Sequence, residues 1–428
     1  MRADPFSHAV ATRSPAAGPG ALTAREGERL AVTATACAVA MLPLLAPRSP
    51  ANMAPVDALI AVAVGTCLLW AGASRHPWRW PYAVPGALLV AGGALGALRG
   101  PVPGAGVVAL LQDAILLAWC WAVANIASSP ERLRVLLATW AYSALAWVVA
   151  LFIGLAAGVT VLTGQTPSEG TRTALTFGDP NYSASYYVIS LMIIWASGYP
   201  RRRALRVVAY ALLVVALVST GSNSGLVSLA IGSVIVAVLA AGRRAGIAAA
   251  VATLAVILLG GAALASRISF KDVQTAAHGS RFAVLRDGLG RSEKSVAQRH
   301  MLLSESLNLY RSGGPLGEGP VSTKPRLRAR MAPFVKEAHD DYIAALIERG
   351  VLGVAGIGLL IGGLAVRLTR LVAAPLADGF AEVVPRPHAL VAAVVGTLVA
   401  MGVYELLHVR HMWALLAFVA ALYIWGRR

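Results

Sequence analysis

The sequence is poor in charged residues and in cysteine. Asp, Glu, Lys and Arg together make up 13% of its 428 residues, about half of the roughly 25% found in soluble domains. No polar block as large as a soluble domain interrupts the chain, which argues against a separate soluble module. The three cysteines, Cys37, Cys67 and Cys120, all lie inside apolar runs. Because a thiol in such a run packs as a small hydrophobe, we expect neither a disulfide nor a cysteine-ligated metal.

Long apolar runs are abundant instead, and 57% of the residues are hydrophobic. A helix needs about 20 residues to cross roughly 30 Å of hydrocarbon. Runs of suitable length lie near residues 30–46, 55–73, 82–98, 104–127, 135–160, 182–198, 205–220, 225–241, 246–265, 343–366, 388–407 and 411–426. The sequence therefore predicts an all-α polytopic membrane protein, with about twelve transmembrane helices in a single transmembrane domain, 30–428.

Residues 1–29 are polar and contain Pro5, Pro15 and Pro19, which predicts a disordered cytoplasmic tail. A cleaved signal peptide is the alternative for the first apolar run, because that run follows basic residues and is rich in alanine. The tail is long for the leading part of a signal peptide, and loss of the run would disturb the alternation of charge along the chain. We therefore keep residues 30–46 as a span.

The formal charge of +17 comes largely from arginine clusters between the apolar runs. These clusters occupy alternate connections: Arg75/Arg79, Arg132/Arg134, Arg201–Arg203 with Arg206, Arg243/Arg244, Arg367/Arg370 and Arg427/Arg428. Cytoplasmic connections are enriched in Lys and Arg, so both termini are predicted to be cytoplasmic, and no nucleic-acid partner is needed to explain the charge. The same alternation makes residues 266–342 a large periplasmic loop between spans nine and ten.

A titratable cluster, His339-Asp340-Asp341-Tyr342, stands directly before the apolar run 343–366. It ends the large loop, which contains every lysine of the chain: Lys271, Lys294, Lys324 and Lys336. Titratable groups at a helix start, beside cations and next to lipid, suit chemistry on a lipid-linked anion. The alternative is structural, since aspartate is a preferred helix N-cap and His339 would then be a bystander.

Two further polar spots lie at predicted outer ends of spans. Asp179-Pro180-Asn181 opens one span, and Ser222-Asn223 lies in the tight turn between two others. Each also has a structural interpretation, as a cap followed by proline or as a plain turn. Because both lie on the same predicted face as the large loop, Asp179, Asn181, Ser222 and Asn223 are secondary site candidates.

Three features of the loop and the run after it bear on these candidates. Residues 298–310 have apolar side chains at helical spacing, which predicts an amphipathic helix on the membrane face. Residues 313–320 are rich in Gly and Pro and predict a turn. No strand precedes this turn and no Gly-Lys-Ser/Thr follows, so we expect no nucleotide site.

Glu348, inside the next apolar run, is expected to face the protein interior and pair with Arg349 or an adjacent helix.

In this order, the motifs resemble those of the O-antigen ligase and O-antigen polymerase superfamily, membrane glycosyltransferases of the GT-C type. The matching pieces are Asp179-Pro180-Asn181, residues 219–225, Arg299, Pro315 to Gly319, His339 to Ile343 with Glu348, Gly350 and Gly353, and Arg410 with Trp413. The resemblance covers the C-terminal two-thirds of the chain, and the first five spans match in hydropathy alone. One departure is Asn223, where the family often has an arginine, so another loop cation would have to take its place.

The resemblance implies an inverting, metal-independent glycosyltransferase of lipopolysaccharide biosynthesis in the bacterial inner membrane. Such enzymes take a glycan from an undecaprenyl diphosphate carrier at the outer leaflet and use no cofactor. A ligase attaches the glycan to a hydroxyl of lipid A-core, and a polymerase attaches it to another glycan. His339 would be the family's histidine and Arg299 its loop arginine.

The residues themselves fit this reaction. A sugar diphosphate is already activated, so no ATP site is required. The acceptor alcohol must lose its proton during attack, and a histidine such as His339 is the natural base near neutral pH. Arg299, with Gln298 and Lys336, would bind the donor diphosphate and stabilise the charge of the leaving group.

Asp340, Asp341 and Tyr342 would orient His339 or line the acceptor pocket. A metal held by the two aspartates would need more oxygen ligands than lie nearby, so none is expected. Three alternatives remain: a polymerase with the same donor, a transporter or flippase of lipid-linked glycans, and a non-catalytic scaffold. Transporters usually contain internal repeats and broken, charged helices at the bilayer midplane. The sequence has no visible repeat, so we favour the ligase.

Overall fold

The computed structural model describes residues 23–46, 53–74, 76–166, 170–267, 269–281, 286, 294–332, 335 and 337–427, without the side chains of residues 270 and 294–300. In these ranges every regular element is a helix, so the all-α prediction is confirmed. Most of the predicted tail, residues 1–29, lies outside the described residues. Its final part is the beginning of the first helix, which starts at Ala24.

The first five predicted spans are helices, although the first begins and ends six residues before its predicted bounds and the fifth begins five residues early. The helices of this half are α1 (Ala24–Ala40), α2 (Pro55–Ala73), α3 (Ala83–Ala97), α4 (Pro103–Ile126), α5 (Pro130–Ala157) and the short α6 (Thr160–Thr163). Proline in the first turn opens α2, α4 and α5, where its missing N–H costs no helical hydrogen bond. Apolar runs that begin with such start signals were therefore readily located in the sequence.

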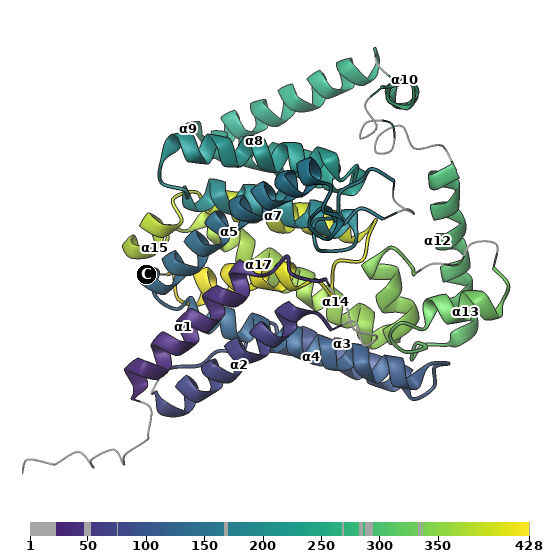
Figure 1. Cartoon of the computed structure of the whole chain (residues 1–428), viewed down its shortest axis with the longest axis horizontal. Coiled ribbons are helices and arrows are strands. Elements are labelled where there is room, and N and C mark those ends of the chain that lie inside the picture. The colour runs from purple at the N-terminus through teal and green to yellow at the C-terminus, as the bar shows by residue number, and fades with distance from the viewer. Residues whose placement is uncertain are drawn as a thin grey trace, which may run out of the picture.

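The second half contains the remaining described helices, and Figure 1 shows them packed beside the first. They are α7 (Pro180–Ser197), α8 (Arg203–Ser219), α9 (Asn223–Ala265), α10 (Phe270–His278), α12 (Lys294–Gly313), α13 (Thr323–Ala329), α14 (Asp341–Ala373), α15 (Asp378–Val383), α16 (His388–Met401) and α17 (Arg410–Ile424). The predicted spans 225–241 and 246–265 are the two halves of α9. They meet at a kink at Ala245 and Gly246, where Gly246 has a φ of 82°.

The predicted span 388–407 is too long. Helix α16 ends at Met401, and residues 402–409 form a loop before α17. The backbone N–H groups of Leu406 and Leu407 donate to the carboxylate of Asp341 instead of to a helical carbonyl. A distant side chain therefore replaces the hydrogen bonds that would have continued the helix, and the 402–409 loop carries polar groups at the end of the bundle.

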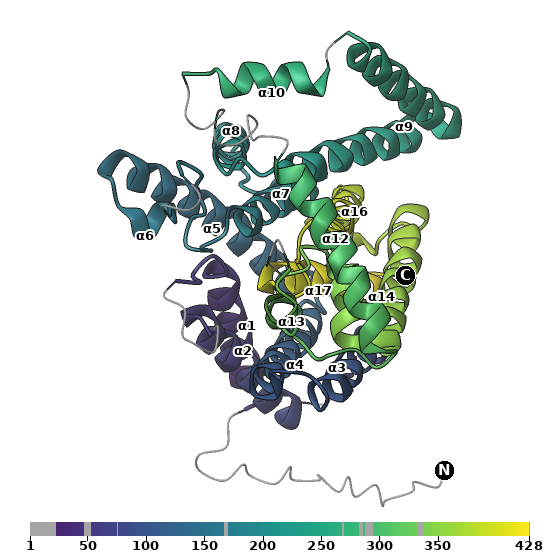
Figure 2. The ribbon, with the colours of Figure 1, turned by 90° about the vertical axis from the view of Figure 1, so that its right-hand side faces the viewer.

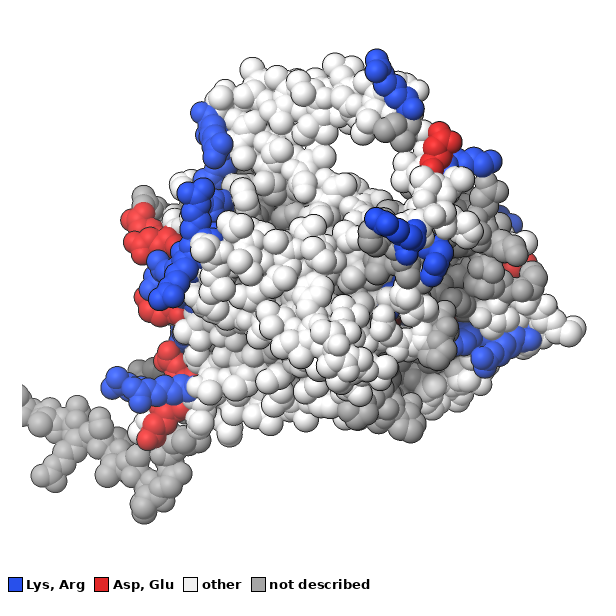
Figure 3. Space-filling view, turned by 45° about the horizontal axis from the view of Figure 1, so that its top comes forward, with Lys and Arg blue, Asp and Glu red and all other residues white. Residues whose placement is uncertain are grey.

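Among the residues that the structure describes, five helices are long and apolar enough to cross a membrane: α2, α4, α5, α9 and α14. Helices α3, α16 and α17 are apolar but shorter. In Figure 3 the charged side chains on the visible face gather at two opposite ends of the molecule, with an uncharged band between them. This arrangement is that of a membrane protein, while the count of twelve crossings stays a prediction.

Helix α17 lies at the centre of the bundle and is buried along almost its whole length. An apolar helix buried on every side is typical of a membrane-protein core. At its start, Arg410 Nε and Nη2 donate to the two carboxylate oxygens of Asp57 in α2, at 2.8 and 2.6 Å. Trp413 Nε1 donates to Leu407 O at 2.6 Å. The motif Arg410-x-x-Trp413 thus anchors both α17 and the 402–409 loop.

Candidate functional site

Polar residues from distant parts of the chain meet at the end of the bundle that carries α12 and α13, which faces the viewer in Figure 2. They come from the starts of α7, α9 and α14 and from the 402–409 loop. We call this group the His339 site. The sequence analysis named its members one by one, without predicting that they meet. It did not name the residues of the 402–409 loop.

His339 is fixed from one side by the 402–409 loop. Its backbone N–H donates to Glu405 Oε1 at 3.1 Å. Its ring stacks on the ring of Tyr404, with centroids 5.3 Å apart and planes inclined by 27°. The backbone φ of His339 is 52°, a value that is uncommon for residues other than glycine. A half-buried imidazole with a fixed backbone and one covered face is pre-oriented for chemistry on its other side.

The residues that follow His339 make the contacts of a helix start. Asp340 is the N-cap of α14, and its Oδ1 accepts from the N–H groups of Tyr342 and Ile343 at 2.8 and 3.1 Å. Burial raises the pKa of Asp340, although these two hydrogen bonds lower it. The buried Asp341 carboxylate accepts from the 402–409 loop, and Tyr342 Oη donates to Leu398 O at 2.6 Å. The cap interpretation is confirmed for Asp340, and all three residues fix the position of His339 along the chain.

The secondary candidates are connected to His339 through Tyr404. Asp179 caps α7, where its Oδ1 accepts from Asn181 N–H at 2.7 Å, and its Oδ2 accepts from Tyr404 Oη. Ser222 caps α9 and donates through its hydroxyl to Asn181 Oδ1 at 2.7 Å. The adjacent Asn223 is the first residue of α9. The cap interpretation of Asp179 was therefore correct, and Ser222, expected in a plain turn, is also an N-cap. The two capping side chains also form one network with the histidine.

Three residues of the 402–409 loop were missed: Tyr404, Glu405 and His408. Burial, together with Tyr182 and Asp179, raises the pKa of Tyr404. Burial and then the nearby carboxylates of other acidic residues raise the pKa of Glu405 well above its usual range. His408 Nε2 lies 2.6 Å from Tyr182 Oη. Ionisable groups inside a membrane-length apolar run are themselves a signal of function, and that signal could have identified this loop.

The chain that leads to His339 is anchored to α14 by backbone contacts. Gly319 N–H donates to Glu348 O, and Val351 N–H donates to Pro315 O, at 2.9 and 2.8 Å. The side chain of Glu348 accepts from Val321 N–H and from the Thr323 hydroxyl, at 3.0 and 2.8 Å. Glu348 therefore holds residues 315–323 in place, and this segment leads through α13 to the histidine.

Arg349 points to a different neighbour from Glu348. Its Nη1 lies 2.7 Å from Asp113 Oδ2 of α4 and donates to Leu89 O of α3 at 3.1 Å. Glu348 was expected to pair with Arg349 or an adjacent helix, and its side chain accepts from the hydroxyl of Thr323, the first residue of α13. The interior orientation expected for Glu348 is also found, with the 315–323 segment as its partner.

Gly317 and Gly350 allow residues 315–317 to approach the backbone of α14 closely. Gly350 has a φ of 59° and a ψ of −152° inside α14, a region that is essentially restricted to glycine. A Cβ added there would lie 2.1 Å from Pro315 O, and one added at Gly317 would lie 2.6 Å from Gly350 N. The spacing Glu348-x-Gly350 therefore reflects a backbone-on-backbone contact.

Replacing Gly350 by alanine should disrupt this contact. The conformational strain amounts to about 1–3 kcal/mol, and overpacking adds a similar amount. We expect a lower melting temperature in detergent and faster proteolysis within residues 314–332. Gly358→Ala in the same helix is the matched control, because nothing lies within 4 Å of its added Cβ. Equal melting temperatures of the two variants would contradict the proposed contact.

The predicted donor-binding residues are only partly described. Gln298 and Arg299 belong to α12, but their side chains are outside the described residues, and Lys336 lies outside them altogether. The later part of α12 packs through Leu302 and Leu309 against α13 and the start of α14. The apolar side of this predicted amphipathic helix therefore contacts protein. Among the described residues no group of three or more His, Cys, Asp or Glu side chains could hold a metal ion.

Tyr404 offers a test of how His339 is held. Tyr404→Phe keeps the ring that stacks on His339 but removes the hydrogen bond to Asp179. Since one such bond contributes about 1 kcal/mol, turnover of a His339-dependent reaction should fall about three- to tenfold. Tyr404→Leu also removes the stacked ring and should lose more. Tyr142→Phe, on the exposed side of α5, is the control. Equal turnover of the two Phe variants would show that the hydrogen bond from Tyr404 to Asp179 does not help to position the histidine.

Comparison with known proteins agrees with the sequence motifs. A family model described as O-antigen ligase, Wzy_C, matches residues 208–358. This segment runs from α8 into α14 and includes the turn before α9, helix α12 and the His339 motif. The comparison with curated proteins gives no match. The match confirms the resemblance to the O-antigen ligase superfamily, while the start of α7 and the 402–409 loop lie outside the matched segment.

Proposed function

We propose that this chain, whose residues 208–358 match a family model described as O-antigen ligase, is a glycan ligase. It transfers a glycan from an undecaprenyl diphosphate carrier to a hydroxyl of lipid A-core, at the outer face of the bacterial inner membrane. The transfer is inverting and requires neither metal nor cofactor. The observation that supports this proposal most strongly is His339, which is held by Tyr404 and Glu405 at the end of an apolar bundle.

In the proposed reaction, His339 accepts the proton of the acceptor hydroxyl. The hydroxyl oxygen then forms a bond to the anomeric carbon of the donor sugar, from the side opposite the diphosphate. The bond between that carbon and the diphosphate oxygen breaks, and undecaprenyl diphosphate leaves with the electron pair. A general base of this kind contributes about 10²–10⁴ to the rate.

The leaving group gains negative charge, which cationic side chains of the large loop neutralise. Arg299 is the proposed main contact, because a guanidinium binds a diphosphate with two parallel hydrogen bonds. Gln298 and Lys336 complete the donor site. The position of Arg299 on α12, a helix that packs against α13 and the start of α14, supports its assignment to the same site as His339.

Asp340, Asp341 and Tyr342 keep the histidine at the surface end of α14, and the network of Asp179, Asn181 and Ser222 supports it through Tyr404, with Asn223 directly after Ser222. Their hydrogen bonds to backbone and to one another suit a positioning role. This assignment leaves the ring of His339 as the group that acts on the acceptor.

The proposed orientation puts residues 266–342 in the periplasm and both termini in the cytoplasm. It is supported by the distribution of arginine. Arg201 and Arg202 lie between α7 and α8, Arg243 and Arg244 lie just before the kink of α9, and Arg427 follows α17. Such clusters mark cytoplasmic ends.

A transfer assay with purified components tests the proposal. With a lipid-linked glycan donor and lipid A-core as acceptor, we expect glycosylated lipid A-core in the presence of EDTA and without nucleotide. A loss of about tenfold or more in EDTA, restored by magnesium, would contradict the metal-independent mechanism. Elongation of the donor glycan with lipid A-core untouched would identify a polymerase. Movement of the donor across vesicles without any transfer would identify a transporter.

A further inference from the structure

A cluster of arginines lies at the end of the bundle opposite α12. Arg206 of α8 donates through Nη1 to Gly198 O at 2.6 Å, and Arg386 donates through Nη1 to Trp195 O at 3.0 Å. A Cβ added at Gly198 would lie 3.7 Å from Arg206 Nη1 and 3.9 Å from Arg386 Nη1. Two guanidinium groups therefore converge on the last turn of α7, and both are only half-exposed.

More positive charge surrounds this pair, and no acidic residue occurs in the segments that form it. Residues 198–206, 240–246 and 384–388 contain seven arginines and neither Asp nor Glu. Arg243 and Arg244 belong to α9, which packs against α16, the helix that begins two residues after Arg386. Within the described part of the chain, the hydrogen bonds of Arg206 and Arg386 use Nη1 alone. Their other N–H groups are thus available to an anion.

An apolar groove begins beside these two arginines. It has a volume of about 380 Å³ and is lined by α7, α8 and α9, including Trp195, Tyr210 and Val236. The guanidinium of Arg386 lies 5.4 Å from the centre of the Trp195 ring, and that ring lies 6.1 Å from the ring of Tyr210. Arg206 lies one helical turn before Tyr210 in α8. One end of the groove is therefore cationic and the remainder is apolar. We call it the α7–α9 groove.

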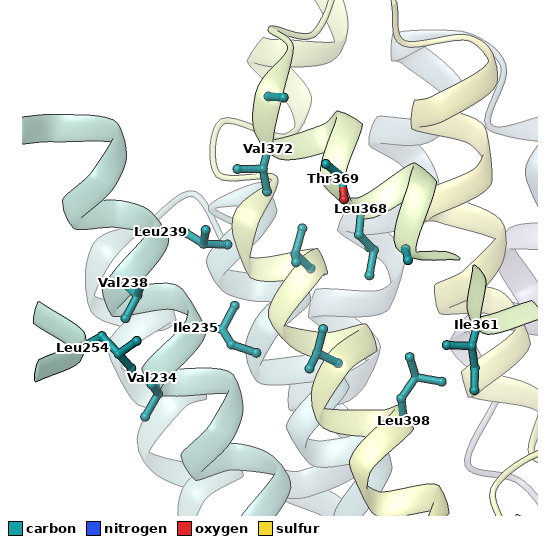
Figure 4. Close-up of a pocket in the computed structure, with 14 residues that line it drawn as sticks. Val234, Ile235, Val238, Leu239, Leu254, Ile361, Leu368, Thr369, Val372 and Leu398 are labelled. Carbon is teal, nitrogen blue, oxygen red and sulfur yellow. The ribbon is translucent and has the colours of Figure 1, made fainter. Parts of the chain in front are cut away.

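A second groove provides a contrast. It is larger, about 680 Å³, and lies between α9, α14 and α16. Figure 4 shows its lining of aliphatic side chains, among which Thr369 is the one polar residue labelled. No arginine or aromatic ring lines it, so it has the features of a surface covered by ordinary hydrocarbon chains. The α7–α9 groove differs in its aromatic lining of Trp195 and Tyr210, and Arg386 lies against the ring of Trp195.

We propose that the α7–α9 groove binds one anionic phospholipid, with its phosphate on Arg206 and Arg386 and an acyl chain along Trp195, Tyr210 and Val236. Arginine suits this role because its planar fork binds phosphate oxygens with paired hydrogen bonds. Arg243 and Arg244 add to the local positive potential, which attracts anionic headgroups at a membrane surface. This site is separate from the His339 site, and the proposal does not depend on the proposed reaction.

Native mass spectrometry can test the site. The protein, released from detergent, is incubated with equal amounts of phosphatidylglycerol and phosphatidylcholine that have identical acyl chains. We expect phosphatidylglycerol to be retained about fivefold or more over phosphatidylcholine. The double variant Arg206→Gln/Arg386→Gln should lose this preference. Arg202→Gln/Arg203→Gln removes the same charge from exposed positions and should keep it.

The groove itself is tested with the arginines left in place. Val236 lines the α7–α9 groove and Val238 lines the second one, so the same substitution two residues apart provides a matched pair. Val236→Trp should reduce retention of phosphatidylglycerol, and Val238→Trp should not. Equal retention in this pair, equal retention in the two arginine double variants, or equal binding of both lipids by the native chain would each overturn the proposal.

Discussion

His339→Ala should lower glycan transfer by about two to four orders of magnitude, the usual contribution of a general base. Affinity for the lipid-linked donor should barely change, because the proposed diphosphate contacts are made by α12 and the loop before α14. Alanine also keeps the backbone N–H that donates to Glu405, so the fold around residue 339 should persist. The measurement is turnover at saturating donor, together with donor affinity determined separately.

The control for this variant is His278→Ala, which removes an exposed histidine of α10. It should leave turnover within about twofold of the native value, since surface substitutions usually change little. A purely structural role of His339 would lower the yield and the melting temperature while the surviving protein kept its specific activity. If His339→Ala retains more than about a third of native turnover, far above the range for a lost base, the assignment is wrong.

Arg410→Leu should have the largest effect on stability. Arg410 and Asp57 form a buried ion pair, with side chains 9% and 7% exposed. Removal of one partner leaves a buried charge uncompensated, which costs about 3–5 kcal/mol. Because Arg410 begins α17 directly after the 402–409 loop, transfer activity should fall as well. Thermal unfolding in detergent measures the first effect, and the transfer assay measures the second.

Two variants make this prediction specific. Arg134→Leu removes an exposed arginine whose Nη2 lies 3.9 Å from Glu382, and such surface pairs contribute about 0–1 kcal/mol. The double variant Asp57→Asn/Arg410→Leu removes both charges and should recover part of the lost stability, since the strongest penalty comes from the isolated charge. A melting temperature of Arg410→Leu equal to that of Arg134→Leu would contradict the importance of the buried pair.

The helices were predictable from hydropathy because each rests on local information: an apolar run with a proline or a cap at its start. The end of α16 was not. Leu406, Leu407 and Val409 keep the run apolar, but the backbone N–H groups of Leu406 and Leu407 donate to Asp341, 65 and 66 residues away, and do not continue the helix. Asp341 is too distant in the sequence to be found when the end of a helix is predicted from neighbouring residues.

Some features of the candidate site were likewise predictable from local sequence, and others were not. His339 and the cap at Asp340 follow from residue types in front of an apolar run. The connection of Asp179 to His339 does not, because it passes through Tyr404, more than 200 positions from Asp179 in the sequence. Helix geometry could have predicted that Glu348 and Arg349 contact different partners, since adjacent residues in a helix point to different faces. Their partners, Thr323 and Asp113, required the tertiary fold.

The central claim is that His339 lies in a donor-binding site at the outer membrane face. Thiol labelling tests it directly, with His339→Cys and Arg202→Cys each made in a chain whose Cys37, Cys67 and Cys120 have been replaced. A membrane-impermeant maleimide should label position 339 from the periplasmic side, more slowly when the lipid-linked donor is present, and position 202 only from the cytoplasmic side. Labelling of both positions from the same side, or no protection of position 339 by the donor, would contradict the account.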